Sequence, residues 1–268
     1  NTSGLSNMDY HIVDKVCDSD GITPGPGGIV RPSTQKYYTE KLLFMDKCFL
    51  SYTPSIGINN LPKLEEQPSV KNGYLTIGTF NRYNKINDRV VAMWEIILQR
   101  CPTVRFVIKT KEFLTDTLRE QFINTWKDTE VFKRVTILDY QDTYQQHLVD
   151  YNLMDIALDT YPYSGTTTSA EALMMGVPVL TLFDSQNGFH AQNVTSSLMI
   201  NSELPEYVCL SEEEYINKVE YFSTHLEELK DLKQAVRDKF VKNICDYPRF
   251  VGELEDKLLT VYKNHKWN

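Results

Sequence analysis

The chain has 268 residues, of which 41% are hydrophobic and 24% charged, and its formal net charge is −8 at pH 7. This composition is ordinary for a globular protein, and the length allows one large or two smaller domains around a sizeable core. The negative charge argues against a general nucleic-acid binder or a membrane-surface protein, because both carry basic faces. No apolar run is long enough to span a bilayer.

Cysteine usage and the start of the chain bear on the cellular compartment. The cysteines are odd in number and form no C-x-x-C pair, which indicates free thiols in a reducing compartment. No basic-then-apolar signal segment stands at the start. Together these features predict a cytoplasmic protein. The first residue is Asn1 rather than methionine, so we expect the chain to be a piece of a longer protein.

The first 72 residues follow a mixed pattern. Alternating apolar residues predict a strand over residues 8–14, and a loop rich in glycine and proline follows at 21–32. A short helix is predicted over residues 34–45 and a strand over 48–52. The polar, proline-punctuated stretch 54–72 indicates a linker between two units.

Beyond the linker, predicted strands and helices alternate. Strands are predicted at residues 74–80, 104–109, 135–138, 156–159, 177–182 and 207–210. Helices are predicted at residues 87–100, 114–126, 143–153, 167–175, 191–199, 212–243 and 250–265. This alternation predicts an α/β fold with a doubly wound parallel sheet covered on both faces.

The stretch 158–179 carries the most chemical information. A strand ends at Asp159, a turn containing Gly165 leads into a helix, and Gly176 ends that helix. Free amides and the positive end of the helix dipole suit an anion at such a helix start. We expect the hydroxyls of Thr166, Thr167 and Thr168 to add donors and Gly165 to let a ligand approach the backbone. One turn further on, Glu171 could accept hydrogen bonds from ribose hydroxyls.

A simpler interpretation of this stretch stays open, since the threonines could serve only as helix N-caps. Neither G-x-G-x-x-G nor G-x-x-x-x-G-K-[ST] occurs in the chain. The sequence therefore shows neither a dinucleotide-binding fingerprint nor a P-loop.

Several separated segments resemble the O-linked N-acetylglucosamine transferase family, including its SPINDLY members. The stretch 158–179 resembles the family signature, and Gly78 to Ile86 resembles its Phe-Asn-…-Lys-Ile segment. The Gln146-His147 helix ahead of residues 155–159 also matches. So does Asn1-Thr2-Ser3-Gly4 followed by Met8-Asp9-Tyr10. The resemblance covers nearly the whole chain.

This resemblance implies a two-lobed GT-B glycosyltransferase. Residues 1–60 would end the N-terminal lobe, residues 61–248 would form the Rossmann-like lobe that binds the nucleotide sugar, and residues 249–268 would form a C-terminal helix. The implied reaction is inverting transfer from UDP-N-acetylglucosamine to a serine or threonine of a protein acceptor. It needs no metal, nucleic acid or membrane. The histidines form no H-x-x-H pair, and Asp18-Ser19-Asp20 imitates a metal-binding D-x-D within a polar loop.

The resemblance also implies roles for single residues. Lys85 would contact the donor diphosphate and stabilise the charge of the leaving nucleotide. Arg82 would lie beside the same phosphates and His147 near the base or ribose. Thr167 and Thr168 would bind the diphosphate. Outside the family context, Lys85 could be a solvated loop lysine and His147 a structural histidine.

The chain departs from the animal members at several places. Thr166 stands where they have histidine, Glu171 where they have aspartate, and Tyr144 and Asp150 replace basic residues near the nucleotide. A GDP-fucose donor therefore stays open, as do a nucleotide-sugar epimerase or hydrolase and a non-catalytic nucleotide-binding module. The first-lobe histidine and the tetratricopeptide repeats of the family precede the segment that Asn1 resembles. We therefore expect the chain alone to bind nucleotide weakly and to transfer sugar poorly or not at all.

Overall fold

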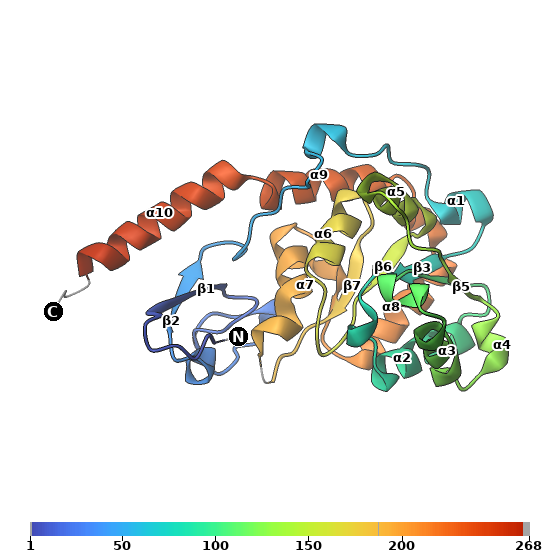
Figure 1. Ribbon diagram of the computed structural model, residues 1–268, viewed down its shortest axis with the longest axis horizontal. Helices are drawn as coiled ribbons and strands as arrows, with labels where there is room; N and C mark the ends of the chain where they lie inside the picture. Colours follow the sequence, from blue (N-terminus) through green and yellow to red (C-terminus); the bar gives the residue numbers. More distant parts are fainter. Residues whose placement is uncertain (1, 187, 265–268) are drawn as a thin grey trace.

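A computed structural model describes residues 2–186 and 188–264 of the chain and places a six-stranded sheet beside a small two-stranded unit (Figure 1). The large sheet has the order β5-β4-β3-β6-β7-β8, and all its neighbouring strands are parallel. Strands β4 and β5 thus follow β3 on one side, and β6, β7 and β8 follow on its other side. This order is that of a doubly wound fold, so the predicted fold class is confirmed. The strands are β3 (Thr76–Thr79), β4 (Arg105–Ile108), β5 (Val135–Ile137), β6 (Ile156–Leu158), β7 (Val179–Leu182) and β8 (Val208–Cys209).

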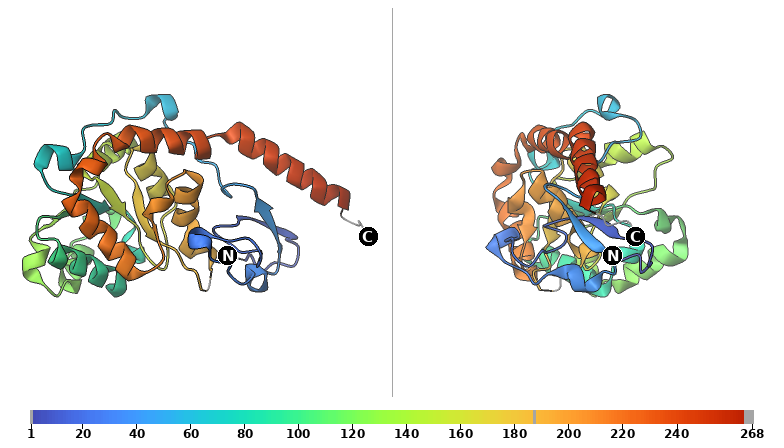
Figure 2. Two further views of the ribbon diagram at one scale, coloured as in Figure 1. Left: turned by 180° about the vertical axis from the view of Figure 1, so that it is seen from behind. Right: turned by 90° about the vertical axis from the view of Figure 1, so that its left-hand side faces the viewer.

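Helices cover both faces of this sheet (Figure 2). Helix α2 packs against α8, while α6 packs against both α7 and α9. Strands β3, β6 and β7 are buried along their whole length, as expected for a parallel sheet covered on both faces. The helices are α1 (Pro68–Asn72), α2 (Asp88–Arg100), α3 (Asp116–Thr125), α4 (Thr129–Phe132), α5 (Tyr144–Val149), α6 (Thr167–Met174), α7 (His190–Asn201), α8 (Glu212–Thr224), α9 (Leu232–Ile244) and α10 (Tyr247–Asn264).

Helix α2 shows how the local sequence fixes these elements. The Asn87 side chain caps the helix by accepting a hydrogen bond from Val90 N at 3.1 Å. Val90, Trp94 and Ile97 recur on one face and are fully buried. The predicted helix over 87–100 is therefore confirmed.

The two-stranded unit corrects two predictions. Strand β1 (Tyr10–Asp14) pairs in parallel with β2 (Lys41–Met45), so the helix predicted over 34–45 is wrong. Only Thr34–Tyr37 forms a 3-10 turn. The stretch 48–52 forms no strand either, because Tyr52 N bonds to Ile244 O at the end of α9 instead of a neighbouring strand.

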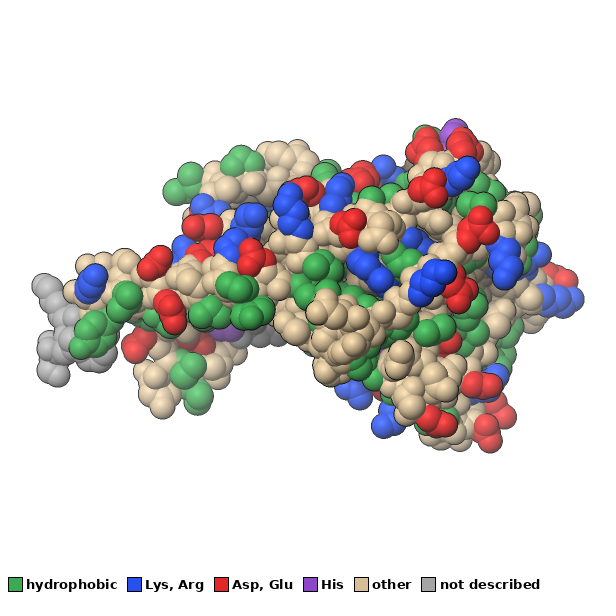
Figure 3. Space-filling model, turned by 90° about the horizontal axis from the view of Figure 1, so that it is seen from above, with side chains coloured by type: hydrophobic (Ala, Val, Ile, Leu, Met, Phe, Trp, Pro, Cys, Tyr) green, Lys and Arg blue, Asp and Glu red, His purple; other side chains and the backbone are tan. Residues whose placement is uncertain are grey.

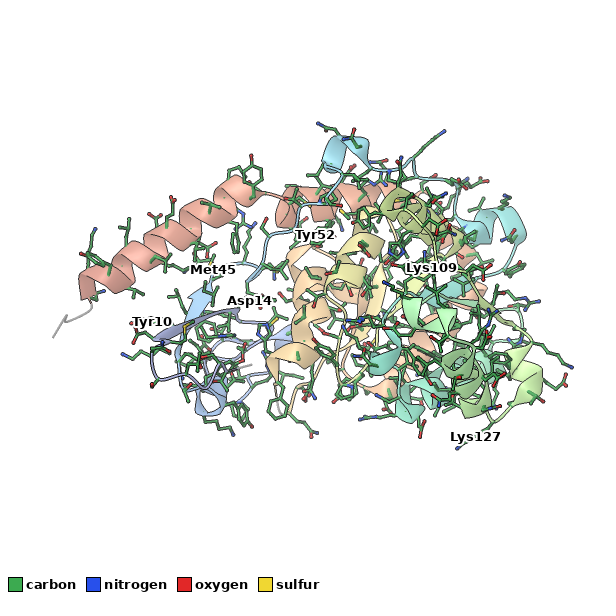
Figure 4. The ribbon with its side chains drawn as sticks, in the orientation of Figure 1. Tyr10, Asp14, Met45, Tyr52, Lys109 and Lys127 are labelled. Atoms are coloured by element: carbon green, nitrogen blue, oxygen red, sulfur yellow. The ribbon has the colours of Figure 1, made fainter. Side chains whose placement is uncertain are left out.

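Asp14 joins this unit to the larger lobe. Its Oδ2 accepts hydrogen bonds from Ser197 Oγ of α7 at 2.5 Å and from Phe49 N at 2.9 Å. Figure 4 shows Asp14 at the end of β1 that lies toward α7. The side chain is 1% exposed, so these bonds compensate for the loss of water around the carboxylate.

The C-terminal part contains more helices than predicted. The helix predicted over 212–243 is interrupted by a 3-10 turn (Leu226–Leu229), and Asp231 takes a φ of 60° before α9 begins. The last helix, α10, confirms the predicted one, whose final residue His265 lies outside the described residues. It runs away from the sheet and over the β1–β2 unit (Figures 1 and 2).

The surface and the thiols agree with the composition. Figure 3 shows acidic and basic side chains interspersed over one face. All five cysteines are free and buried, which confirms the predicted free thiols. None of the described helices combines the length and the apolar character that a membrane crossing requires.

Candidate functional site

The strand order changes direction between β3 and β6, and ligands of doubly wound sheets bind at the carboxyl ends of the strands at this point. The segment after β3 contains Asn81, Arg82 and Lys85, and the segment after β6 leads into α6. Both groups of predicted site residues therefore meet at one edge of the sheet.

Lys85 is held against the turn that precedes α6. Its Nζ donates a hydrogen bond to Ser164 O at 2.7 Å and lies 4.2 Å from the centre of the Tyr163 ring. Burial lowers the pKa of Lys85, and the nearby Asp159 carboxylate opposes this shift. The structure thus brings a partly buried ammonium group to the start of α6, where the sequence predicted a diphosphate.

The first turn of α6 leaves its donors available. Thr166 occupies the N-cap position, but its side chain accepts no capping hydrogen bond. Thr166 and Thr167 are exposed, whereas Thr168 Oγ1 donates to Asn81 Oδ1 at 2.9 Å. The Thr166 side chain therefore leaves the first amides of α6 without a capping hydrogen bond. Free amides at a helix N-terminus favour an anion.

Gly165 serves the turn in a way that the sequence did not indicate. Its N–H donates to Asp159 Oδ1 at 2.7 Å, so this amide is already satisfied within the protein. A Cβ at this position would collide with Ser169 Oγ. We expected Gly165 to admit a ligand, but its visible function is to let the turn pack against α6. Asp159 is buried and also accepts from Thr181 Oγ1 at 2.8 Å.

His147 and Glu171 form a pair beside this turn. His147 Nε2 lies 3.1 Å from Glu171 Oε2, and Tyr151 OH donates to the same oxygen at 3.3 Å. The other ring nitrogen, His147 Nδ1, is buried and has no hydrogen-bond partner among the described residues. A buried unpaired ring nitrogen fits a ligand that supplies a hydroxyl or N–H group.

Arg82 lies at the rim of a neighbouring cavity. Its side chain is 73% exposed, and Nε lies 3.3 Å from Glu112 Oε1. The cavity, of about 250 Å³, lies between the segments that follow β3 and β4 and the His147 helix. It is lined by Phe80, Arg82, Lys109, Thr110, Lys111, Glu112, Tyr140 and His147.

Lys109, which lines this cavity, forms a buried ion pair with Asp150. Lys109 Nζ lies 2.7 Å from Asp150 Oδ2 and 4.2 Å from the centre of the Phe80 ring (Figure 4 labels Lys109). Burial lowers the pKa of Lys109, while Asp150 opposes the shift. Asp150, where the resemblance implies a basic residue, is thus paired with a cation that directly follows β4.

The D-x-D sequence is used for structure. Asp18 accepts hydrogen bonds from Thr34 and Tyr38, and Asp20 accepts two from the backbone of Ile22 and Thr23. Within residues 2–186 and 188–264, no three His, Cys, Asp or Glu side chains are grouped so that they could hold a metal ion.

Sequence reasoning missed Asn81, Asp159, Ser164 and Lys109. Asn81 lies within the segment 78–86 and Asp159 within the stretch 158–179. A polar side chain at the end of a predicted strand could have indicated both as site residues. Lys109 ends the predicted strand 104–109, where a charged residue after an apolar run is also a signal. Ser164 acts through its carbonyl oxygen, and no side-chain pattern indicates such a role.

Comparison with known proteins decides the family. A sequence profile of Glycosyl transferase family 41 matches residues 64–248. The chain belongs to this family. It is 33% identical over 267 residues to the "Probable UDP-N-acetylglucosamine--peptide N-acetylglucosaminyltransferase SPINDLY" of Hordeum vulgare, a match that covers 99% of this chain and 26% of that protein. The chain thus spans about a quarter of the length of such relatives.

Solved structures agree with this family and give the fold. An O-GlcNAc transferase of Thermobaculum terrenum superposes with a TM-score of 0.80 at 31% identity, over 96% of this chain and 45% of that one. S. aureus TarM, solved with UDP, superposes with a TM-score of 0.52 at 11% identity, over 82% of this chain and 40% of TarM, and so supports the fold alone. The chain is therefore a family 41, O-GlcNAc transferase-like glycosyltransferase domain of GT-B fold. Membership in family 41 implies a nucleotide-sugar donor and an acceptor.

Proposed function

We propose that this chain is the donor-binding part of an inverting, metal-independent transferase that moves N-acetylglucosamine from UDP-N-acetylglucosamine to serine or threonine hydroxyls of proteins. In this reaction the acceptor oxygen bonds to the anomeric carbon from the face opposite the diphosphate. The bond from that carbon to the diphosphate oxygen breaks, and UDP leaves with the electron pair. The relatives named above support this choice of donor and acceptor.

One observation carries the proposal: Lys85 Nζ lies 2.7 Å from Ser164 O, beside the uncapped start of α6. A diphosphate placed there would meet helix amides on one side and an ammonium group on the other. Negative charge grows on the diphosphate as it leaves, so donors fixed in advance stabilise the transition state more than the ground state.

The base and ribose would extend toward His147. The unpaired His147 Nδ1 could accept a hydrogen bond from the nucleoside, while Glu171 holds Nε2 and fixes the ring. Phe80 and Lys109 line the adjoining cavity of about 250 Å³, which offers an aromatic face and a cation to a base. Arg82 would reach the phosphates or the base from the rim.

A GDP-fucose donor is the second candidate. It is favoured by Tyr144 and Asp150, which stand where the family resemblance implies basic residues near the nucleotide. Glu112, the carboxylate that lines the cavity, could accept hydrogen bonds from the N–H groups of guanine, of which uracil has fewer.

A thermal-shift panel tests both candidates. UDP, GDP, UDP-N-acetylglucosamine and GDP-fucose are added to the chain, each with Mg²⁺ and with EDTA. A ligand that binds only the folded state raises the Tm, and the rise grows with the logarithm of the ligand concentration relative to its Kd. We expect UDP and its sugar to raise the Tm, with no dependence on Mg²⁺. A larger shift with GDP would favour the second donor, and no shift with any nucleotide would contradict the proposal.

A further inference from the structure

A second histidine–carboxylate pair lies between the two-stranded unit and the larger lobe. His190 Nδ1, at the first residue of α7, lies 2.7 Å from Asp18 Oδ2. Asp18 is fully buried, and its Oδ1 accepts from Thr34 Oγ1 and from Tyr38 OH, each at 2.9 Å. An ionised carboxylate only accepts hydrogen bonds, so Asp18 Oδ2 accepts one from His190 Nδ1. The imidazole therefore carries a proton on Nδ1.

The ring of His190 packs against that of Phe49, with ring centres 4.6 Å apart, and its side chain is 12% exposed. The imidazole lines a cavity of about 310 Å³ whose walls include the rings of Tyr37 and Phe189, 4.9 Å apart. Within residues 2–186 and 188–264, His190 Nε2 makes no hydrogen bond. An unprotonated Nε2 beside a mostly apolar cavity is a proton acceptor that water solvates poorly.

Backbone hydrogen bonds connect the start of α7, which carries His190, to the residue that Lys85 contacts. Ala191 O, one residue after His190, accepts hydrogen bonds from Ser164 N at 3.0 Å and from Ser164 Oγ at 2.9 Å. The carbonyl of that serine accepts the bond from Lys85. A single residue therefore connects the lysine at the diphosphate position with the loop that carries His190.

We propose that His190, oriented by Asp18, accepts the proton of the acceptor hydroxyl that attacks the donor sugar. The inference rests on the transferase function proposed above. As the hydroxyl oxygen bonds to the anomeric carbon and the diphosphate departs with the electron pair, the hydroxyl proton passes to His190 Nε2. Asp18 keeps its hydrogen bond to Nδ1 throughout and stabilises the imidazolium. The cavity between Tyr37 and Phe189 would hold the hydroxyl-bearing acceptor.

Other charged groups around His190 are few. His11 of β1 lies with its ring centre 6.1 Å away, and burial lowers the pKa of His11, which favours its neutral form. Burial and the Asp18 carboxylate raise the pKa of Tyr38, so this phenol stays a donor. Asp18 is thus the one carboxylate in direct contact with the imidazole among the described residues.

Chemical reactivity of the histidines tests the orientation. Diethyl pyrocarbonate acylates unprotonated, accessible imidazole nitrogens, and mass spectrometry of peptides from the whole chain locates the products. We expect rapid modification of His190 and a roughly tenfold slower one in Asp18→Asn, because an asparagine amide donates to Nδ1 and moves the proton to Nε2. His225, which is bonded to Tyr221 O and lies outside the centre, should react equally in both proteins. An inert His190, or equal rates in both proteins, would overturn the proposal.

The wild-type chain gives an independent check that needs no variant. Long-range ¹H–¹⁵N spectra distinguish the two imidazole tautomers, and the proposal requires the Nδ1–H form of His190 near neutral pH. Finding the Nε2–H form would overturn it.

The catalytic role itself is measured with the chain in excess over labelled UDP-N-acetylglucosamine and a serine- and threonine-rich peptide, so that even the poor transfer expected of the chain alone is detected as single turnovers. General-base catalysis contributes about 10²–10⁴-fold, so His190→Gln should lower label transfer to the background level and leave the Kd for UDP within about twofold. Unchanged transfer in His190→Gln overturns the proposal. The proposed function fails separately, if none of UDP, GDP and their sugars raises the Tm of the chain.

Discussion

The Nζ atom of Lys85 donates to the carbonyl oxygen of Ser164 at 2.7 Å, across 79 residues of sequence. This bond connects the loop after β3 to the loop after β6. The strand order of the sheet changes direction between these two strands. The lysine is thereby placed before any ligand arrives, so little conformational entropy is lost when a diphosphate binds.

Removal of this ammonium group should weaken diphosphate binding. Lys85→Ala is expected to raise the Kd for UDP by about 10–100-fold, since hydrogen bonds to charged groups contribute about 1.5–3 kcal/mol. Titration calorimetry measures the affinity. Lys71→Ala, at an exposed lysine of α1, is the matched control and should bind like wild type. Equal affinities for both variants would contradict the role of Lys85.

The His147–Glu171 pair should act as one unit in nucleotide binding. Glu171→Gln keeps the shape of the side chain but weakens its hold on His147 Nε2, so we expect about tenfold lower affinity for UDP. His147→Ala should have a similar effect, and the double variant should lose little more than either single one. Titration calorimetry of wild type and the three variants measures the Kd for UDP and completes this double-mutant cycle. Fully additive losses would show that the two residues act separately.

The buried turn at Gly165 should not tolerate a methyl group. Gly165→Ala drives a Cβ into Ser169 Oγ and should lower the free energy of unfolding by about 1–3 kcal/mol. Gly252→Ala is the control, because a Cβ at that position in α10 meets no atom within 4 Å. It should be neutral or should stabilise α10 slightly. Urea denaturation compares the three proteins, and equal midpoints would contradict the packing argument.

Removal of one partner of the Lys109–Asp150 ion pair should lower the free energy of unfolding strongly. Asp150→Ala leaves a cation that is 1% exposed without its carboxylate, which should cost about 3–5 kcal/mol. Glu130→Ala breaks the exposed pair with Lys133 and should cost less than about 0.5 kcal/mol. Urea midpoints measure both losses. A small loss in Asp150→Ala would mean that Lys109 reaches water.

Lys233 should make the free energy of unfolding depend on pH in the alkaline range. Burial lowers its pKa to about 8, with Asp155 opposing the shift, whereas an unfolded lysine titrates near about 10.4. Between these values the unfolded state binds more protons than the folded state. The contribution of Lys233 to the free energy of unfolding should therefore rise as the pH goes from about 8 to about 10. Buried thiols such as Cys48 and Cys209, whose pKa burial raises, contribute with the opposite sign over this range. Urea denaturation at a series of pH values, with reductant present, should therefore show wild type gaining stability relative to Lys233→Met.

Much of the larger lobe could be predicted from sequence because its signals are local. The side chain of Asn87 caps α2, and Gly176, with a φ of 70°, ends α6 as expected of a left-handed glycine. The order of the strands follows from these elements and the right-handed crossover rule. The predicted strand 156–159 and the helix that begins at Thr167 accordingly match the structure to within a residue.

The first unit could not be predicted in the same way. Leu42, Leu43 and Phe44 form an apolar run that fits a helix or a strand, and only the partner strand β1, about 30 residues earlier, decides between them. In the site, Lys85 and α6 could be placed together only through the family resemblance. The pair of Asp18 and His190, 172 residues apart, has no local signal at all.

The location of the diphosphate is the central claim, and backbone amide NMR of the chain titrated with UDP tests it most directly. We predict the largest shift changes at the amides of Thr167, Thr168 and Ser169, accompanied by changes around Lys85. Changes confined to another cavity, such as the one of about 340 Å³ beside Arg89 and Glu212, would contradict the account.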